Sequence, residues 1–123
     1  LFSGCTASYM PTSKSQFQKG YYLTTGDSMM PLFKPNSVAY VQPKSFSEIQ
    51  QGDIIVYIHR NELVMHRAIA KYGGGWVAMG DNEEEVDSLR VRPDNFRGIA
   101  YPEPVDYLGE DYQGKLHATA LLR

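Results

Sequence analysis

The sequence contains a single cysteine, which excludes a disulfide within the chain. It has no run of 18 or more apolar residues, so no segment is predicted to span a membrane as a helix, and we expect the chain as given to be soluble. It also lacks a charge excess: 12 basic and 14 acidic residues give a net charge of −2, which provides no electrostatic basis for binding nucleic acid. No internal repeat is present, which excludes a repeat array. The 123 residues suffice for one small domain.

Short apolar and β-branched runs, separated by Gly, Pro and Asn, make up most of the sequence and are typical of a mainly β protein. We expect strands at residues 21–25, 37–42, 54–59, 63–70, 75–79 and 96–105, and short helical turns at residues 28–33 and 45–50. Residues 71–75 (Lys-Tyr-Gly-Gly-Gly) have the composition of a hairpin connection. The sequence therefore predicts a twisted, partly closed antiparallel β fold with one or two short helical turns.

A candidate nucleophile lies in residues 26–31 (Gly-Asp-Ser-Met-Met-Pro), where a serine stands between a flexible glycine and a proline that stiffens the chain. A serine attacks poorly near neutral pH unless a base within about 3 Å takes its proton. His66, in the strand-like stretch 63–70, is the candidate base. A later carboxylate, Asp81 or Asp87, can orient the imidazole, because only the spatial arrangement of such a triad matters and not its order along the chain.

Four segments, in their order along the chain, resemble the sequence boxes of type I signal peptidases. These membrane-associated serine proteases remove signal peptides from exported proteins. The segments are residues 26–31, 51–57, 63–70 and 80–88, and the resemblance covers roughly residues 22 to 100. Most bacterial members use a lysine base. The His-Arg pair at residues 66 and 67 is similar to the histidine-base variant of the endoplasmic reticulum, archaea and some Gram-positive bacteria.

The resemblance implies a role for each site residue. Ser28 is implied as the nucleophile and His66 as the general base and then general acid. Asp87 is preferred to Asp81 as the carboxylate that orients His66, because its Val-Asp-Ser setting is more similar to the last box, and Asp81 is expected to brace the turn. The implied reaction is amide hydrolysis through an acyl-enzyme. The implied substrate is an extended protein or peptide segment with small side chains near the cleaved bond.

Two positions depart from the family pattern. Gly26 replaces a small hydroxyl residue that often helps to bind the oxyanion, so oxyanion binding is expected to depend on the backbone N–H of Ser28 and a second donor such as Thr25. Asp27 creates the segment Gly-Asp-Ser-Met, which also occurs in the related self-cleaving proteases of the SOS-repressor type. Those proteins resemble Ser-Lys dyads and lack the Gly-Asp-Asn box at residues 80–82, so the box and the histidine favour the signal peptidases.

Three alternatives to a signal peptidase stay open. The chain can be a self-processing protease of the SOS-repressor type, or a processing peptidase with one dedicated substrate. It can also be a binding or assembly module that kept the fold and lost activity. In that case Ser28 is only a turn hydroxyl, and His66 is a core histidine whose hydrogen bonds are satisfied.

The remaining expectations concern the ends of the chain and the other titratable residues. Residues 1–20 are expected to form a linker or the remnant of an anchor, before a single peptidase-like catalytic domain at residues 21–123. The resemblance implies that the full-length protein is anchored at the extracytoplasmic face of a membrane, and a lipid on Cys5 would provide such a tether.

No catalytic role is expected for His59, beside a hairpin turn, or for His117, in a C-terminal tail. The run Glu83–Glu85 is expected to be a solvated loop without metal-ligand spacing, so we predict no metal site and no cofactor.

Overall fold

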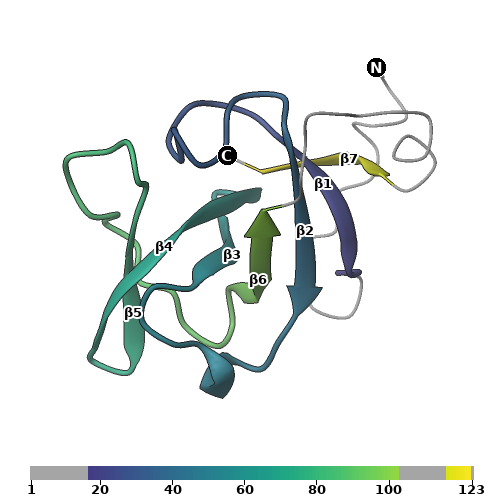
Figure 1. Ribbon diagram of the computed structural model, residues 1–123. Helices are drawn as coiled ribbons and strands as arrows, with labels where there is room; N and C mark the ends of the chain where they lie inside the picture. Colours follow the sequence, from purple (N-terminus) through teal and green to yellow (C-terminus); the bar gives the residue numbers. More distant parts are fainter. Residues whose placement is uncertain (1–16, 103–115, 123) are drawn as a thin grey trace.

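The structure is a computed structural model that describes residues 17–102 and 116–122. Its strands, shown in Figure 1, are β1 (Gly20–Thr24), β2 (Val38–Pro43), β3 (Ile54–His59), β4 (Glu62–Tyr72), β5 (Gly75–Met79), β6 (Phe96–Pro102) and β7 (Leu116–Leu122). A single 3-10 turn, η1 (Phe46–Glu48), is the helix of the described residues, and it is preceded by the capping residue Ser45. Within these residues no helix has the length and apolar character of a membrane span. The predicted mainly β class is confirmed.

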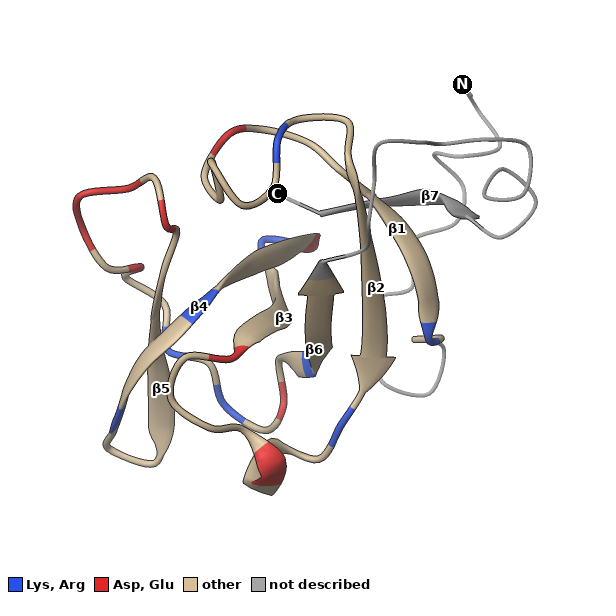
Figure 2. Ribbon diagram, in the orientation of Figure 1, with Lys and Arg blue, Asp and Glu red and all other residues tan. Residues whose placement is uncertain are grey.

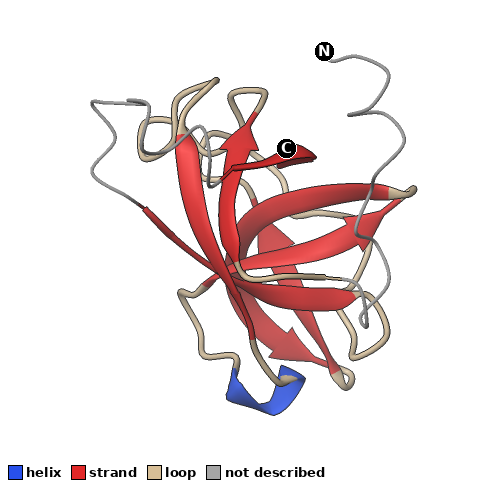
Figure 3. Ribbon diagram, turned by 90° about the vertical axis from the view of Figure 1, so that its right-hand side faces the viewer, coloured by secondary structure: helices blue, strands red, loops and turns tan. Residues whose placement is uncertain are grey.

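The seven strands form one sheet in the order β3-β6-β2-β1-β7-β4-β5. Because β3 also pairs with β4, the sheet curves back on itself, and Figure 3 shows its strongly twisted strands with η1 at one end. The closure is partial, as predicted, since β4 and β7 share only the pair Leu63 and Leu122. The pairings are antiparallel except those of β7, which runs parallel to β1 and β4.

Strand β7 differs from the sequence-based expectation, which assigned its residues to a C-terminal tail. Its partners β1 and β4 lie far away in the sequence, so the strand depends on long-range pairing. No hairpin turn in the sequence therefore indicates its presence. The last predicted strand also ends earlier than expected, at Pro102, and residues 103–105 lie outside the described residues.

Strand β3 is apolar without alternation because both of its faces are buried. Ile54 and Val56 belong to one core cluster, whereas Ile55 and Tyr57 belong to another. Strand β4 is divided in the same way, with Leu63 and Met65 in the first cluster and Val64 and Ala68 in the second. Since side chains alternate along a strand, residue 66 lies on the face of the second cluster. The fold therefore holds a histidine in a largely apolar environment.

Two tight turns fix the register of β4 on its neighbours. Arg60 and Asn61 both have positive φ, 53° and 65°, which suits the two-residue connection between β3 and β4. Gly73 and Gly74, with φ of 60° and 80°, connect β4 to β5 within the predicted hairpin segment. The first turn sets His66 opposite Ile55 in the β3–β4 ladder.

Candidate active site

Ser28 lies in the connection between β1 and β2, residues 25–37, which we call the Ser28 loop. The backbone N–H of Met30 donates to Asp27 O at 3.1 Å, and that of Phe33 donates to Met29 O at 2.9 Å, so residues 28–33 form hydrogen-bonded turns in place of the predicted helical turn. The side chains of Met29 and Phe33 are buried in the first core cluster. The core therefore fixes the residues that follow Ser28, while Ser28 itself stays partly exposed.

A second loop, residues 80–88 between β5 and β6, packs against the Ser28 loop. Figure 2 shows the concentration of acidic residues in this segment, which we call the acidic loop. The backbone N–H of Asn82 donates to Ser28 O at 2.8 Å, and its side-chain amide donates to Asp27 O at 3.1 Å. Gly80 is required by this close approach, because a Cβ added there would lie 2.7 Å from Ser28 O.

We expect Gly80→Ala to lower the reactivity of the Ser28 hydroxyl toward a fluorophosphonate probe by about 100-fold, because the new methyl group must push the Ser28 backbone out of line, and misplacements near 1 Å have effects of this size. Gly75→Ala, at the other end of β5, is the matched control: its Cβ would approach Val91 O at 3.1 Å, away from Ser28. The labelling rate per folded molecule, measured beside thermal unfolding, checks the result. Equal losses in both variants would contradict a specific role for Gly80.

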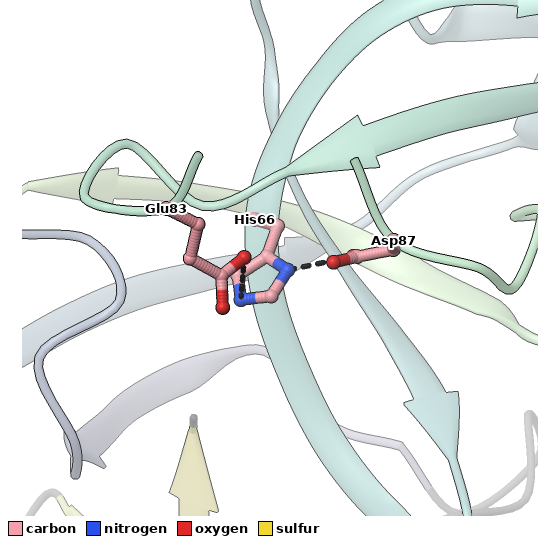
Figure 4. Close-up of side chains that lie close together, drawn as sticks. All are labelled: His66, Glu83 and Asp87. Carbon is pink, nitrogen blue, oxygen red and sulfur yellow. Dashed lines mark hydrogen bonds and ion pairs between the residues drawn. The ribbon is translucent and has the colours of Figure 1, made fainter. Parts of the chain in front are cut away.

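His66 brings the two loops and β4 together. Its side chain is buried, its Nε2 lies 3.1 Å from Ser28 Oγ, and its Nδ1 lies 2.7 Å from Asp87 Oδ2. Asp87 is held in turn by its backbone N–H, which donates to Ala78 O of β5 at 2.7 Å. Figure 4 shows Asp87 on one side of the imidazole. The hydroxyl, imidazole and carboxylate are therefore in the order that moves a proton from serine to histidine.

Asp81 points to a different partner. Its carboxylate accepts two hydrogen bonds from the Arg67 guanidinium, at 2.8 and 2.7 Å, and Arg67 also donates to Gly52 O at 2.9 Å. The hydrogen bond to Asp81 raises the pKa of Arg67 above its usual value, although partial burial acts in the opposite direction. Asp81 thus ties the acidic loop to β4 through Arg67, whose guanidinium also reaches the turn before β3.

Two residues that the sequence analysis did not select also reach His66. The buried Tyr57 hydroxyl donates to Asp87 Oδ2 and lies 3.2 Å from His66 Nδ1. Burial, followed by the hydrogen bond and the negative charge of Asp87, raises the pKa of Tyr57 above its ordinary value. Glu83, expected in a solvated run, accepts a hydrogen bond from Gly80 N at 3.1 Å and places Oε1 3.9 Å from His66 Nε2. The β3–β4 register could have indicated Tyr57, whereas no sequence signal indicated Glu83.

The family model described as Peptidase S24-like matches residues 6–101 of the chain. The chain belongs to the Peptidase S24-like family. No curated protein and no solved structure matches the chain. Membership supports a serine peptidase, and it places the chain in a superfamily that self-cleaving proteases share with the signal peptidases. The recognition made from the sequence is therefore correct at the level of this superfamily.

One group of side chains in this Peptidase S24-like site contains the atom types that metal ions bind. Among the described residues, His66, Glu83 and Asp87 are grouped closely enough to be considered as ligands, with ligand atoms within 4.8 Å of one another. Asp87 lies at Nδ1 and Glu83 at Nε2, on opposite sides of the ring (Figure 4). The arrangement places carboxylates on both sides of the imidazole.

An open cleft of about 430 Å³ lies over Ser28 and His66 in the S24-like fold. Its walls are the start of the Ser28 loop, the tip of the β3–β4 hairpin including His59, and the acidic loop. Gly26 lines the cleft with a φ of 74°, a conformation that L side chains rarely adopt, so a glycine fits where the sequence comparison expected a small hydroxyl residue. The serine therefore lines an open cleft together with His66. His117 and Cys5 have no described side chains, and the proposed tether falls outside the described residues.

Proposed function

We propose that this chain is a serine endopeptidase that hydrolyses an extended peptide segment through an acyl-enzyme. Ser28 is the nucleophile, His66 the general base and then general acid, and Asp87 the carboxylate that orients the imidazole. The observation that carries the proposal is the 3.1 Å contact between Ser28 Oγ and His66 Nε2, with Asp87 on the other ring nitrogen. The family match supports the serine peptidase class independently of this geometry.

The proposed proton path follows from the two contacts of His66. His66 carries its proton on Nδ1 and donates a hydrogen bond from it to Asp87. The lone pair of Nε2 is then free to accept the Ser28 proton as the hydroxyl attacks the carbonyl carbon. The resulting imidazolium is stabilised by Asp87 and then donates its Nε2 proton to the leaving amine. Water attacks the acyl-enzyme by the reverse path. Within the described residues the Ser28 backbone N–H donates no hydrogen bond, which supports its use as an oxyanion donor.

The edge of β4 supports an extended substrate. Its second side pairs with β7 at Leu63 and with β5 from Arg67 onward, so Val64–His66 have no strand partner there among the described strands. Backbone groups at an open edge can pair with an added strand, which brings a peptide past Ser28. The resemblance to the histidine-base signal peptidases adds two points to the proposal. The substrate has small side chains near the cleaved bond, and the full-length protein is anchored at the extracytoplasmic face of a membrane, either by its own chain or by a lipid on Cys5.

A second candidate is self-cleavage, because the family supports self-cleaving as well as processing proteases. In this case the segment that enters the cleft belongs to the same chain or to a partner regulator. The two candidates share the site and differ only in the origin of the peptide.

The proposal is tested by incubating the chain with a library of preprotein-like peptides and determining the cut positions by mass spectrometry, with Ser28→Ala as the control. We expect cleavage at defined bonds by the natural chain and none by the variant, because the hydroxyl forms the covalent intermediate. Shortening of the chain itself at one bond, absent in Ser28→Ala, would favour self-cleavage. Peptide and chain both intact, together with no reaction at Ser28 with a fluorophosphonate probe, would contradict the proposal.

A further inference from the structure

The Tyr57 hydroxyl is a buried polar group for which the proposed reaction has no role so far. The Tyr57 side chain has no exposed surface, and its ring belongs to the second core cluster. A tyrosine that serves only to fill the core has no need of a hydroxyl, and phenylalanine occupies such positions without the need for a hydrogen-bond partner. The position of the hydroxyl therefore requires an explanation.

The sheet register directs Tyr57 toward His66. Tyr57 pairs with Val64 in the β3–β4 ladder, and two residues earlier Ile55 pairs with His66. Diagonal neighbours on one face of a sheet are within reach of an aromatic side chain. The two rings lie 6.3 Å apart at 71°, an edge-on arrangement that carries the Tyr57 hydroxyl past the imidazole to the carboxylate.

Two donors converge on one oxygen of Asp87. The Tyr57 hydroxyl donates to Oδ2, and His66 Nδ1 lies 2.7 Å from the same atom. The backbone of Asp87 is fixed on β5 through Ala78, but rotation about the side-chain bonds still has to be restricted. The hydroxyl supplies this restriction through its hydrogen bond to Oδ2. Burial and the adjacent carboxylate raise the pKa of Tyr57, so the hydroxyl keeps the proton that it donates.

We propose that Tyr57 is a positioning residue, whose hydroxyl holds the Asp87 carboxylate so that Asp87 Oδ2 meets His66 Nδ1. This inference rests on the proposed function, since it concerns the same serine, histidine and aspartate. Tyr57 acts through Asp87 and has no contact of its own with Ser28 in the described interactions. The chemical consequence is a fixed tautomer of His66, with its Nε2 lone pair kept toward Ser28.

The test compares Tyr57→Phe with Tyr22→Phe. Tyr22 is also fully buried, but its hydroxyl donates to Gln18 O at 2.6 Å in the first core cluster, so Tyr22→Phe removes a buried hydroxyl without affecting Asp87. Two quantities are measured on each folded variant. One is the rate constant for labelling of Ser28 by a fluorophosphonate probe, and the other is the set of ring nitrogen signals of His66 in ¹⁵N-histidine-labelled protein, assigned with His66→Ala.

We expect Tyr57→Phe to slow labelling by about 10- to 100-fold, the range that corresponds to the loss of a hydrogen bond to a charged group, and to shift the His66 signals. Tyr22→Phe should leave both unchanged. Labelling of Tyr57→Phe at the natural rate, or slower labelling with unmoved His66 signals, would overturn the inference. If the natural chain is not labelled at all, the proposed function fails, and the nitrogen signals still decide whether Tyr57 positions the imidazole.

Discussion

His66→Ala is expected to lower peptide cleavage by a factor on the order of 10⁶, close to the loss expected for Ser28→Ala. The reason is that Nε2, 3.1 Å from the hydroxyl, is the proposed acceptor that takes its proton during attack and returns it to the leaving amine. Because the two side chains act as one unit, the double variant should be no slower than either single variant. Turnover of a cleavable peptide, followed over long incubations, checks these values.

Lys71→Ala is the matched control for His66→Ala. Lys71 lies on the same strand, five residues later, and its ammonium group sits 6.0 Å from the Trp76 ring centroid. A lysine base is the common arrangement among bacterial signal peptidases, so the comparison separates the two bases directly. We expect Lys71→Ala to retain natural turnover. Loss of activity in Lys71→Ala with retention in His66→Ala would reverse the assignment of the base.

The stability of the His66→Ala protein also bears on the result. His66 is buried beside Tyr57 and Asp87, and removal of its ring leaves the Asp87 carboxylate without one of its two donors. A moderate decrease in thermal stability is expected from this, on the order of 1–3 kcal/mol in the free energy of unfolding. Activity is therefore compared per folded molecule, so that unfolding does not imitate a catalytic effect.

The parts of the fold that depend on local pattern could be predicted from the sequence. Strands β3 and β5 occupy the predicted residues, because each is an apolar run bounded by turn residues. Strand β7 was missed because its pairing with β1 and β4 is parallel and distant in sequence. Local patterns report burial and turn chemistry, and they carry little information about which distant segment completes a sheet.

Some residues of the candidate site could likewise be predicted from the sequence, and others could not. Ser28, His66 and Asp87 could be selected through the resemblance of their segments, and the structure brings these three together. From the sequence, Tyr57 could be interpreted only as part of an apolar strand, because its contact with Asp87 depends on the β3–β4 register and on the path of the acidic loop.

From the sequence, Glu83 could be interpreted only as one of three adjacent glutamates in a solvated loop. Glu83, Glu84 and Glu85 are all exposed, as the solvated run predicts, but the carboxylate of Glu83 also accepts a hydrogen bond from Gly80 N and lies 3.9 Å from His66 Nε2. The direction in which a loop side chain points depends on backbone geometry that composition does not encode.

Asp87→Asn is expected to lower turnover by about 10⁴-fold with little change in substrate binding. An asparagine preserves the size of the side chain but removes the charge that stabilises the imidazolium, and its amide nitrogen can face His66 as a donor. The amide donor favours the wrong tautomer, with the proton on Nε2, so the ring can no longer accept the proton of Ser28, and the lost charge leaves any imidazolium less stable. Separate measurement of kcat and KM checks the expectation, because the loss should appear in kcat.

Asp81→Asn provides the comparison on the same loop. Asp81 pairs with Arg67 near the surface, and partly exposed ion pairs of this kind contribute about 0–1 kcal/mol to stability. We therefore expect Asp81→Asn to keep kcat within a few-fold of the natural chain while slightly lowering the unfolding temperature. If the two variants lost activity equally, the acidic loop as a whole would be responsible and not the carboxylate of Asp87. If only Asp81→Asn lost activity, Asp81 would have to move to His66 in the complex with substrate, and the orienting role assigned to Asp87 would be wrong.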